Sequence, residues 1–306
     1  MKKRDFLCLS DLGPGGIERL LDDAARMHRL RGTSEHPRII AGKSAALLFD
    51  KASTRTRVSL EVAVYELGGH PIVVTAQGSQ IARGEPPADT ARVLERYVHL
   101  IAYRTFATQT LVEIARTARI PVINALTDDS HPLQLLADLY TVRRVRGRLQ
   151  GLRYAWVGDG NNMARSWIEA AGLLGLDLVL ACPEGYEPPQ AEIDDANAKG
   201  ARVRIVRDPR EACEGADVVN TDVWASMGQE DEAERRRKAF AGYCVSKEML
   251  AKASSEHMVL HCLPAHRGEE IEADVIDGPR SFVWDQAEAR LHTAKAVIAW
   301  ALDGSS

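Results

Sequence analysis

The sequence contains no apolar run long enough to cross a membrane, which takes about 20 residues, and no signal peptide follows its basic N-terminus. Its five cysteines are an odd, scattered set without a CxxC pair, which indicates reduced thiols and not a disulfide framework. The net charge of −4 and the pI near 6.2 give no general attraction to nucleic acid or to anionic membranes. These absences predict a cytoplasmic protein that has no nucleic-acid or membrane partner.

What remains is the composition of an ordered globular protein. Hydrophobic residues make up 45% of the chain and charged residues 27%, so disorder is not expected. The 306 residues exceed one typical core and fit two domains of about 150 residues each. No repeat array and no low-complexity tract interrupts them.

Short apolar runs alternate with helix-like segments in both halves, a pattern typical of parallel α/β sheets. Strands are expected at 43–50, 70–75, 100–103, 121–125, 153–157, 177–181, 202–206, 217–221 and 258–261. We predict two doubly wound parallel-sheet domains joined by long helices, at 1–146 and 147–288, with a C-terminal helix, 289–306, that packs back on the N-terminal domain. Ligands of such sheets collect beyond the carboxyl ends of the strands.

The stretch from Ser53 to Gly69 follows the first expected strand and has helical spacing. Ser53 or Thr54 is the expected N-cap, and Arg55 and Arg57 stand in the first turn. Cations there oppose the helix dipole, whereas a bound dianion such as phosphate would make them favourable. The alternative is an ordinary capped helix with two solvated arginines.

Two further strand ends of the first half carry polar side chains. Arg104 follows one strand, and a loop with His131 and Gln134 follows the next. We expect them to face the same crevice as Ser53 and to supply anion or carbonyl ligands, although a single histidine is more often structural.

In the second half, Gly158 and Gly160 follow a strand, as in dinucleotide-binding loops. The third glycine of that fingerprint is missing, with Met163 in its place, so the nicotinamide interpretation has little support. Asn161 and Asn162 at the next helix start are caps in one interpretation; in the other, an amide there holds a substrate carboxylate.

The segment from Asp222 to Gly228 is interpreted as a substrate cradle, with helix capping as the alternative. Asp222 suits an ammonium group, with Ser226 beside it, and Trp224 and Met227 suit an aliphatic stem.

Another strand end carries His261, Cys262 and His266, whose spacing matches no common zinc pattern, so no metal site is predicted. Cys262 is either a nucleophile, which would need a thiolate and a base, or part of a shaped pocket that contacts a polar substrate.

Together these motifs resemble, in order and over essentially the whole chain, the aspartate/ornithine carbamoyltransferase family, and within it the ornithine branch. The resemblance rests on the segments 53–57, 79–85 with 89–94, 103–105, 131–134, 158–162, 222–228, 261–264 and 285–290. One departure is Leu133, which stands where the family usually has a smaller residue and leaves the fine shape of the carbamoyl pocket open.

The resemblance implies roles for individual residues. Arg104, His131 and Cys262 are the catalytic candidates it gives. The implied carbamoyl phosphate ligands are Ser53, Thr54, Arg55, Thr56, Gln80 from a neighbouring subunit, Arg104, His131, Gln134, Cys262, Leu263 and Arg290. The implied ornithine ligands are Asn162, Asp222, Ser226 and Met227.

The implied reaction transfers the carbamoyl group of carbamoyl phosphate to the δ-amine of L-ornithine, giving L-citrulline and phosphate for arginine biosynthesis. It needs no metal or redox cofactor, and the resemblance suggests a homotrimer or a multiple of trimers with shared sites. Three alternatives stay open at this point: another amine acceptor such as putrescine, a non-catalytic anion-binding protein, and a dehydrogenase that uses the Gly158 loop.

Overall fold

The computed structural model describes residues 3–78, 80–81, 84–225 and 232–302. The chain divides into two compact units, Met1–Tyr140 with Glu288–Ser306, and Thr141–Ala287. Two helices, α5 (Pro132–Arg146) and α12 (Val283–Leu302), contribute residues to both units. The prediction of two parallel-sheet domains with a C-terminal helix that returns to the first is confirmed.

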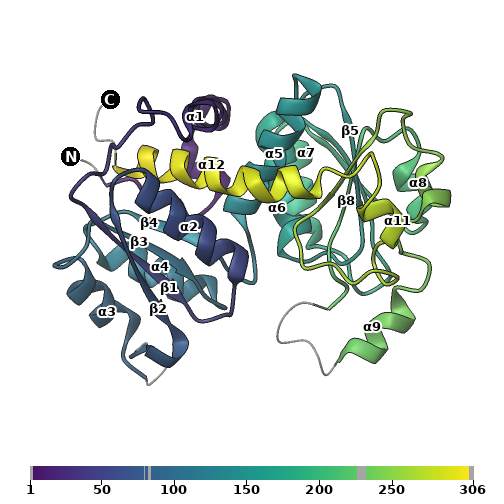
Figure 1. The fold of residues 1–306 in the computed structure, drawn as a ribbon. Coiled ribbons are helices and arrows are strands. Elements are labelled where there is room, and N and C mark those ends of the chain that lie inside the picture. The colour runs from purple at the N-terminus through teal and green to yellow at the C-terminus, as the bar shows by residue number, and fades with distance from the viewer. Residues whose placement is uncertain (1–2, 79, 82–83, 226–231, 303–306) are drawn as a thin grey trace. The chain divides into compact units, whose positions relative to one another are not determined.

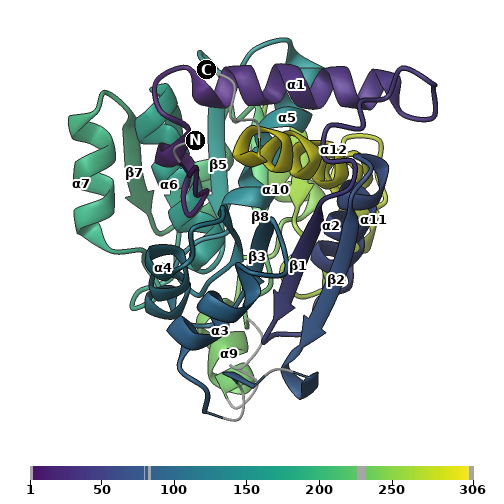
Figure 2. The ribbon, with the colours of Figure 1, turned by 90° about the vertical axis from the view of Figure 1, so that its left-hand side faces the viewer.

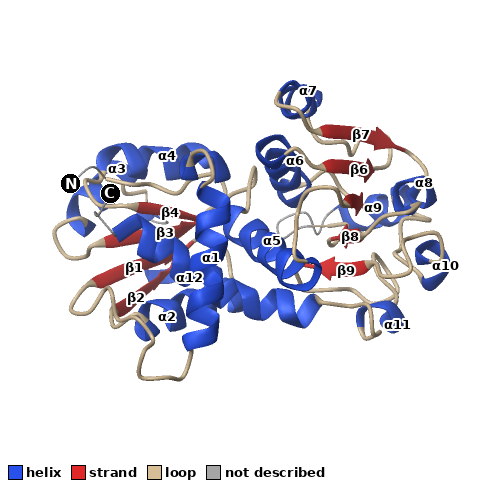
Figure 3. Ribbon diagram, turned by 90° about the horizontal axis from the view of Figure 1, so that it is seen from above, coloured by secondary structure: helices blue, strands red, loops and turns tan. Residues whose placement is uncertain are grey.

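The first unit is built on four parallel strands in the order β2-β1-β3-β4. They are β1 (Ser44–Phe49), β2 (His70–Thr75), β3 (Leu100–Arg104) and β4 (Val122–Leu126). The helices are η1 (Leu9–Leu12), α1 (Gly16–Leu30), α2 (Thr54–Glu66), η2 (Ala76–Gly78), α3 (Pro87–Leu94) and α4 (Thr108–Thr117). Helices α3 and α4 cover one face of the sheet, and α2 and α12 lie on the other (Figure 3). Strands β3 and β4 are buried throughout, as expected for parallel strands covered on both faces, whereas the edge strand β2 is partly exposed.

The second unit is built on five parallel strands in the order β7-β6-β5-β8-β9. They are β5 (Arg153–Val157), β6 (Asp177–Ala181), β7 (Arg202–Val206), β8 (Val218–Thr221) and β9 (Met258–His261). The helices are α6 (Asn162–Leu174), α7 (Gln190–Ala198), α8 (Pro209–Cys213), α9 (Ala233–Ala239), α10 (Lys247–Leu250) and α11 (Ala273–Ile276). Helices α6 and α7 lie on one side of the sheet, and α8, α10 and α11 on the other (Figures 1 and 3).

Both sheets reverse their strand order once, between β1 and β3 in the first unit and between β5 and β8 in the second. At such a switch point the loops that follow the two central strands leave toward opposite faces and open a crevice for ligands. Four candidates from the sequence lie at or just after the carboxyl ends of these strands: Ser53, Arg104, Gly158 and Asp222.

Differences from the expected elements are confined to ends and short helices. Helix α12 begins at Val283, six residues before the start expected for the C-terminal helix. Helices α9, α10 and α11 span seven, four and four residues, too few for an apolar period to be visible in the sequence. Helices α1 and α12 lie side by side (Figures 1 and 2). None of the helices described here combines the length and the apolar character that a membrane span requires.

Candidate active site

Helix α2 begins with a capping residue, Ser53, and with an arginine, Arg55, that has no acidic neighbour in the first turn. The Ser53 side chain accepts a hydrogen bond from the Thr56 amide at 3.3 Å, so Ser53 is the N-cap, and the first turn has no acidic residue. Arg57 is exposed and pairs with Glu61 at 2.7 Å. Arg55 is half-buried, and no residue in the described part of the chain forms an ion pair or hydrogen bond with it. The two arginines therefore differ: Arg57 is a solvated surface residue, whereas Arg55 adds to the positive end of the helix dipole.

Arg290 of α12 joins three of the predicted side chains within the first unit. Its guanidinium donates to the Gln134 carbonyl oxygen at 2.6 Å, to Thr56 Oγ1 at 2.8 Å and to His131 Nε2 at 3.3 Å. All four residues are at least 95% buried. Gln134 in turn donates to the carboxylate of the buried Asp138 at 2.8 Å. A guanidinium that makes three such bonds holds α2, the start of α5 and α12 in one fixed arrangement.

The electrostatics of this network keep His131 neutral. Burial lowers the pKa of His131 well below its ordinary value, and the positive charges of Arg290 and Arg104 lower it further. Because arginine can only donate, the bond from Arg290 makes Nε2 of His131 the acceptor and leaves the proton on Nδ1. His131 is thus arranged as a neutral donor and not as an imidazolium.

The carboxyl ends of β1 and β3 add further charges to the first unit. Arg104 is buried at the end of β3, where the register with β4 shifts by one residue, as in bulges that re-aim side chains beside active sites. Lys51, after β1, is also buried; it pairs with Asp128 and lies 4.3 Å from the ring centroid of Phe106. Sequence reasoning missed Lys51, although its place directly after a buried strand was a usable signal.

In the second unit, Asp222 is the centre of a small polar group at the end of β8. It is buried and accepts hydrogen bonds from Asn161 Nδ2 at 2.9 Å and from the Cys262 thiol at 3.0 Å. The same Asn161 caps α6 by accepting from two of its amides. The asparagine in contact with Asp222 is therefore Asn161, while Asn162, the expected ornithine ligand, is the first residue of the helix.

The turn that follows β9 is held by His261. Its Nδ1 accepts from the Leu263 amide at 2.9 Å, so Nε2 carries the proton that is donated to Glu270 at 3.0 Å. Both side chains are fully buried. Leu263 has φ of 62°, a left-handed conformation that costs free energy in a leucine and is found where surrounding bonds impose it. The His261 bond to the Leu263 amide is one such constraint, and it fixes the backbone beside Cys262.

A buried ion pair between Arg236 and Asp159 holds the segment that follows Asp222. Arg236 of α9 donates to Asp159 at 2.7 Å and to the Trp224 carbonyl at 2.8 Å, and its guanidinium lies 5.0 Å from the Tyr186 ring centroid. Burial raises the pKa of Asp159, and Arg236 opposes that rise. The Trp224 indole stacks on Phe240, so it belongs to the core of this unit. Sequence reasoning did not find Arg236, which is distant in sequence from both partners.

The glycine loop after β5 has a packing explanation. A Cβ at Gly160 would lie 2.3 Å from the Pro188 nitrogen. The backbone of Pro188 therefore fills the space beside this glycine. In a dinucleotide-binding loop, the space beside this glycine is filled by the pyrophosphate of the ligand. This observation removes the basis of the dehydrogenase alternative.

The remaining predicted ligands include exposed residues and residues that the structure does not describe. Thr54 and Gln80 are exposed, and Leu133 is buried at the start of α5. Ser226 and Met227 lie outside the described residues.

Known proteins resemble this chain over nearly its whole length. Residues 4–144 match the family model for the carbamoyl-P binding domain of aspartate/ornithine carbamoyltransferases, and residues 150–301 match that for their Asp/Orn binding domain. The ornithine carbamoyltransferase of Geobacter metallireducens is 52% identical over 97% of this chain and 98% of its own. That of Sorangium cellulosum is also 52% identical, over 99% and 98%. The solved ornithine carbamoyltransferase from Pyrococcus furiosus is similar with a TM-score of 0.94 at 47% identity, covering 99% of this chain and 98% of its own.

Proposed function

This chain belongs to the aspartate/ornithine carbamoyltransferase family, and on that premise we propose that it transfers the carbamoyl group of carbamoyl phosphate to the δ-amine of L-ornithine. The products are L-citrulline and phosphate. The observation that carries this assignment is the guanidinium of Arg290 bonded to Thr56, His131 and Gln134, in the unit that matches a carbamoyl-P binding domain.

The start of α2 is the proposed phosphate site. Backbone amides at a helix start, the Ser53 and Thr54 hydroxyls and the unengaged Arg55 offer hydrogen-bond donors to a dianion. Arg104, buried at the end of β3, is the second cation of this site. The phosphate that leaves in the reaction stays bound by the same groups.

The carbamoyl oxygen is the proposed target of one charged donor, Arg104, and two neutral donors, His131 and Thr56. When the δ-amine attacks the carbamoyl carbon, negative charge grows on that oxygen in a tetrahedral intermediate. Arg104, His131 and Thr56 are the proposed donors that stabilise it, and a preorganised donor of this kind is typically worth about 3 kcal/mol in the transition state. The neutral state of His131 supports its role as a donor from Nδ1.

Ornithine is proposed to bind in the second unit, which matches the Asp/Orn binding domain. The buried carboxylate of Asp222 suits the α-ammonium group, and the amide groups at the α6 start suit the α-carboxylate. Ser226 and Met227 remain proposed members of this site. Cys262, bonded to Asp222, is proposed to shape the pocket and not to act as a nucleophile.

The reacting amine has to be uncharged. Amines of the lysine type have a pKa of about 10.4, so at neutral pH only a small fraction is free, and the rate should rise toward alkaline pH. The departing phosphate is the proposed acceptor of the amine proton. A rate that stays flat between about pH 6 and 9 at saturating substrate would contradict this step.

The direct test is to incubate the purified chain with carbamoyl phosphate and either ornithine or putrescine, and to measure carbamoylated product and phosphate. Ornithine should give citrulline and phosphate in equal amounts, with much faster turnover than putrescine. Faster turnover of putrescine would replace the proposed acceptor, and no product with either amine would leave only the anion-binding alternative.

We also propose a cytoplasmic homotrimer that shares its sites and serves arginine biosynthesis. Exposed apolar side chains on α2, such as Val58 and Tyr65, support self-association, and the exposed Gln80 is free to reach a neighbouring subunit. Light scattering should give three times the chain mass of 33.6 kDa. In addition, mixing inactive Gln80→Ala and Arg290→Gln subunits should restore activity, because a hybrid holds sites with both native residues; no recovery would contradict shared sites.

A further inference from the structure

Arg236 of α9 is a buried cation that joins three segments of the second unit. Its guanidinium donates to Asp159, after β5, at 2.7 Å and to the Trp224 carbonyl, after β8, at 2.8 Å. All three residues are at most 8% exposed, and the ring centroid of Tyr186 lies 5.0 Å from the guanidinium. Trp224 stands two residues after Asp222, so Arg236 lies beside the proposed ornithine site.

Two buried carboxylates share this part of the unit. Asp159 follows β5 and Asp222 follows β8, and these two strands are neighbours in the sheet. Burial raises the pKa of Asp159; Arg236 opposes that rise, and the negative charge of Asp222 adds to it. Arg236 bonds to Asp159, whereas Asp222 accepts from two neutral donors, Asn161 and the Cys262 thiol. Two carboxylates and one guanidinium therefore leave one uncompensated negative charge.

We propose that Arg236 determines which acceptor is used, because it neutralises Asp159 and leaves Asp222 as the one uncompensated carboxylate of the acceptor site. This inference rests on the proposed function. One negative charge suits the head group of ornithine, in which an ammonium and a carboxylate are adjacent. A second negative charge would repel that carboxylate, whereas putrescine has no carboxylate to be repelled. Arg236 therefore favours an amino acid over a diamine.

Neighbouring ionisable groups in the described part of the chain leave this balance in place. Glu232 accepts from Arg236 at 3.2 Å, but it also pairs with Arg235 at 2.8 Å. The side chains of Glu232 and Arg235 are 40% and 68% exposed, so solvent screens their charges. Burial and the charge of Asp159 raise the pKa of Cys182 to about 12, so this thiol is uncharged at neutral pH.

The test compares two acceptors at saturating carbamoyl phosphate. The readout is the kcat/KM for ornithine divided by the kcat/KM for putrescine, each variant being compared with the wild type at the same pH. In Arg236→Gln this ratio should fall about tenfold at about pH 8.5, which is the order of effect that one neighbouring charge has on an ionisation equilibrium. The fall should be smaller at about pH 6, where Asp159 without its partner takes up a proton.

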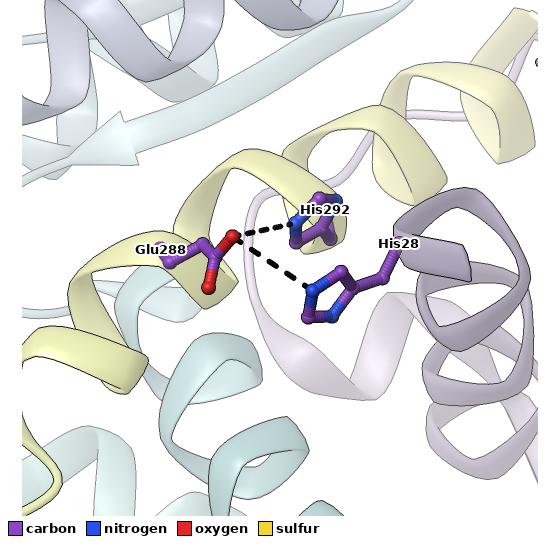
Figure 4. A group of neighbouring side chains, drawn as sticks. All are labelled: His28, Glu288 and His292. Atoms are coloured by element: carbon purple, nitrogen blue, oxygen red, sulfur yellow. Dashed lines mark ion pairs between the residues drawn. The ribbon is translucent and has the colours of Figure 1, made fainter. Parts of the chain in front are cut away.

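A double variant separates charge from structural support. In Asp159→Asn with Arg236→Gln, amides replace both charged groups, so Asp222 is again the one uncompensated carboxylate. The acceptor ratio should return to within about threefold of the wild-type value at both pH values, as the coupling of a charge pair requires. Two single variants are controls that should leave the ratio unchanged. Arg237→Gln removes an exposed cation of the same helix, and Glu288→Gln removes a carboxylate that lies between His28 and His292 in the first unit (Figure 4).

Binding of L-norvaline, which has the head group of ornithine but no δ-amine, tests the inference without turnover. Its affinity, measured by calorimetry with carbamoyl phosphate present, should fall in Arg236→Gln and recover in the double variant. A wild type that binds norvaline but forms no citrulline would contradict the proposed function, and the norvaline affinities would still test Arg236. The inference is overturned by a wild type that does not bind norvaline, by an unchanged acceptor ratio in Arg236→Gln, by a loss that the double variant does not reverse, or by an equal shift in either control.

Discussion

The two units place opposite charges at equivalent positions of similar sheets. At the strand ends of the first unit stand Arg55 and Arg104, with Arg290 beside them on α12. In the second unit Asp159 and Asp222 occupy the corresponding ends. Arg236 pairs with Asp159, whereas Asp222 accepts from two neutral donors, Asn161 and Cys262. A doubly negative donor substrate and an ammonium-bearing acceptor call for this division. The sheet topology alone therefore does not specify the ligand; the side chains after the strands do.

The units also differ in how their polar groups are held. In the first unit a single guanidinium bonds three side chains directly. In the second, support is indirect: Arg236 holds the Trp224 carbonyl, and His261 holds the Leu263 amide. Mutations of the supporting groups should therefore be more costly in the first unit than in the second.

The largest effect is expected for Arg290→Gln. The change removes donors to Thr56, His131 and Gln134 together, so kcat should fall about 100- to 1,000-fold with the fold retained by circular dichroism. The control is Arg144→Gln, which removes a half-exposed pair with Asp285 and should change kcat less than about twofold. A loss below tenfold for Arg290→Gln would mean that the network is structural only.

The next effect compares two arginines of one helix turn. Arg55→Gln should lower kcat/KM for carbamoyl phosphate about 10- to 100-fold, because a charge-assisted bond to phosphate contributes about 1.5–3 kcal/mol. Arg57→Gln is the matched control, because Arg57 is exposed and pairs with Glu61; it should have almost no effect. Equal losses for both variants would point to a general effect of charge and not to a site at Arg55.

A smaller and more selective effect is expected for Asp222→Asn. The amide keeps the size of the side chain and can still accept from Asn161, but it loses the charge that suits an ammonium group. We expect kcat/KM for ornithine to fall about tenfold while the affinity for carbamoyl phosphate, measured by calorimetry, stays unchanged. A change in carbamoyl phosphate affinity would contradict the assignment of Asp222 to ornithine alone.

The smallest expected effect is a dependence of the free energy of unfolding on pH, caused by His131. Its pKa is lowered in the folded chain, so below the unfolded value of about 6.5 the unfolded state binds a proton that the folded state does not. This contribution to stability is present above pH 6.5 and is lost as pH falls, by at most about 1.4 kcal/mol per pH unit. Urea unfolding between pH 7 and 5 should show this slope, and His131→Gln should flatten it; an unchanged slope would show that other groups cause it.

The fold and most of the site could be predicted because their signals are local. Buried parallel strands are apolar runs, and chemistry follows directly where each run ends, as at Ser53, Arg104 and Asp222. Most of what was missed depends on side-chain contacts that the sequence does not show, within one helix or between distant segments. Asp138 lies one helix turn from Gln134, yet only the structure shows that it orients that side chain. Nothing local marks Arg236 as the partner of Asp159, or His28 as the neighbour of His292.

Local signals also leave open which of two neighbouring asparagines contacts Asp222. Asn161 and Asn162 both stood at a helix start, and the sequence could not tell which would turn toward Asp222. Capping decides it, because the residue before the first helical residue has an extended backbone that leaves its side chain free to reach across.

The contribution of α12 to the first unit has a consequence for synthesis. Arg290 is encoded near the end of the message, whereas Thr56, His131 and Gln134 emerge much earlier. All four strands of the first sheet are translated before the second unit, but the guanidinium that joins the polar groups is translated only after it. An unfinished chain therefore contains the four strands and the three polar side chains without the arginine that joins them.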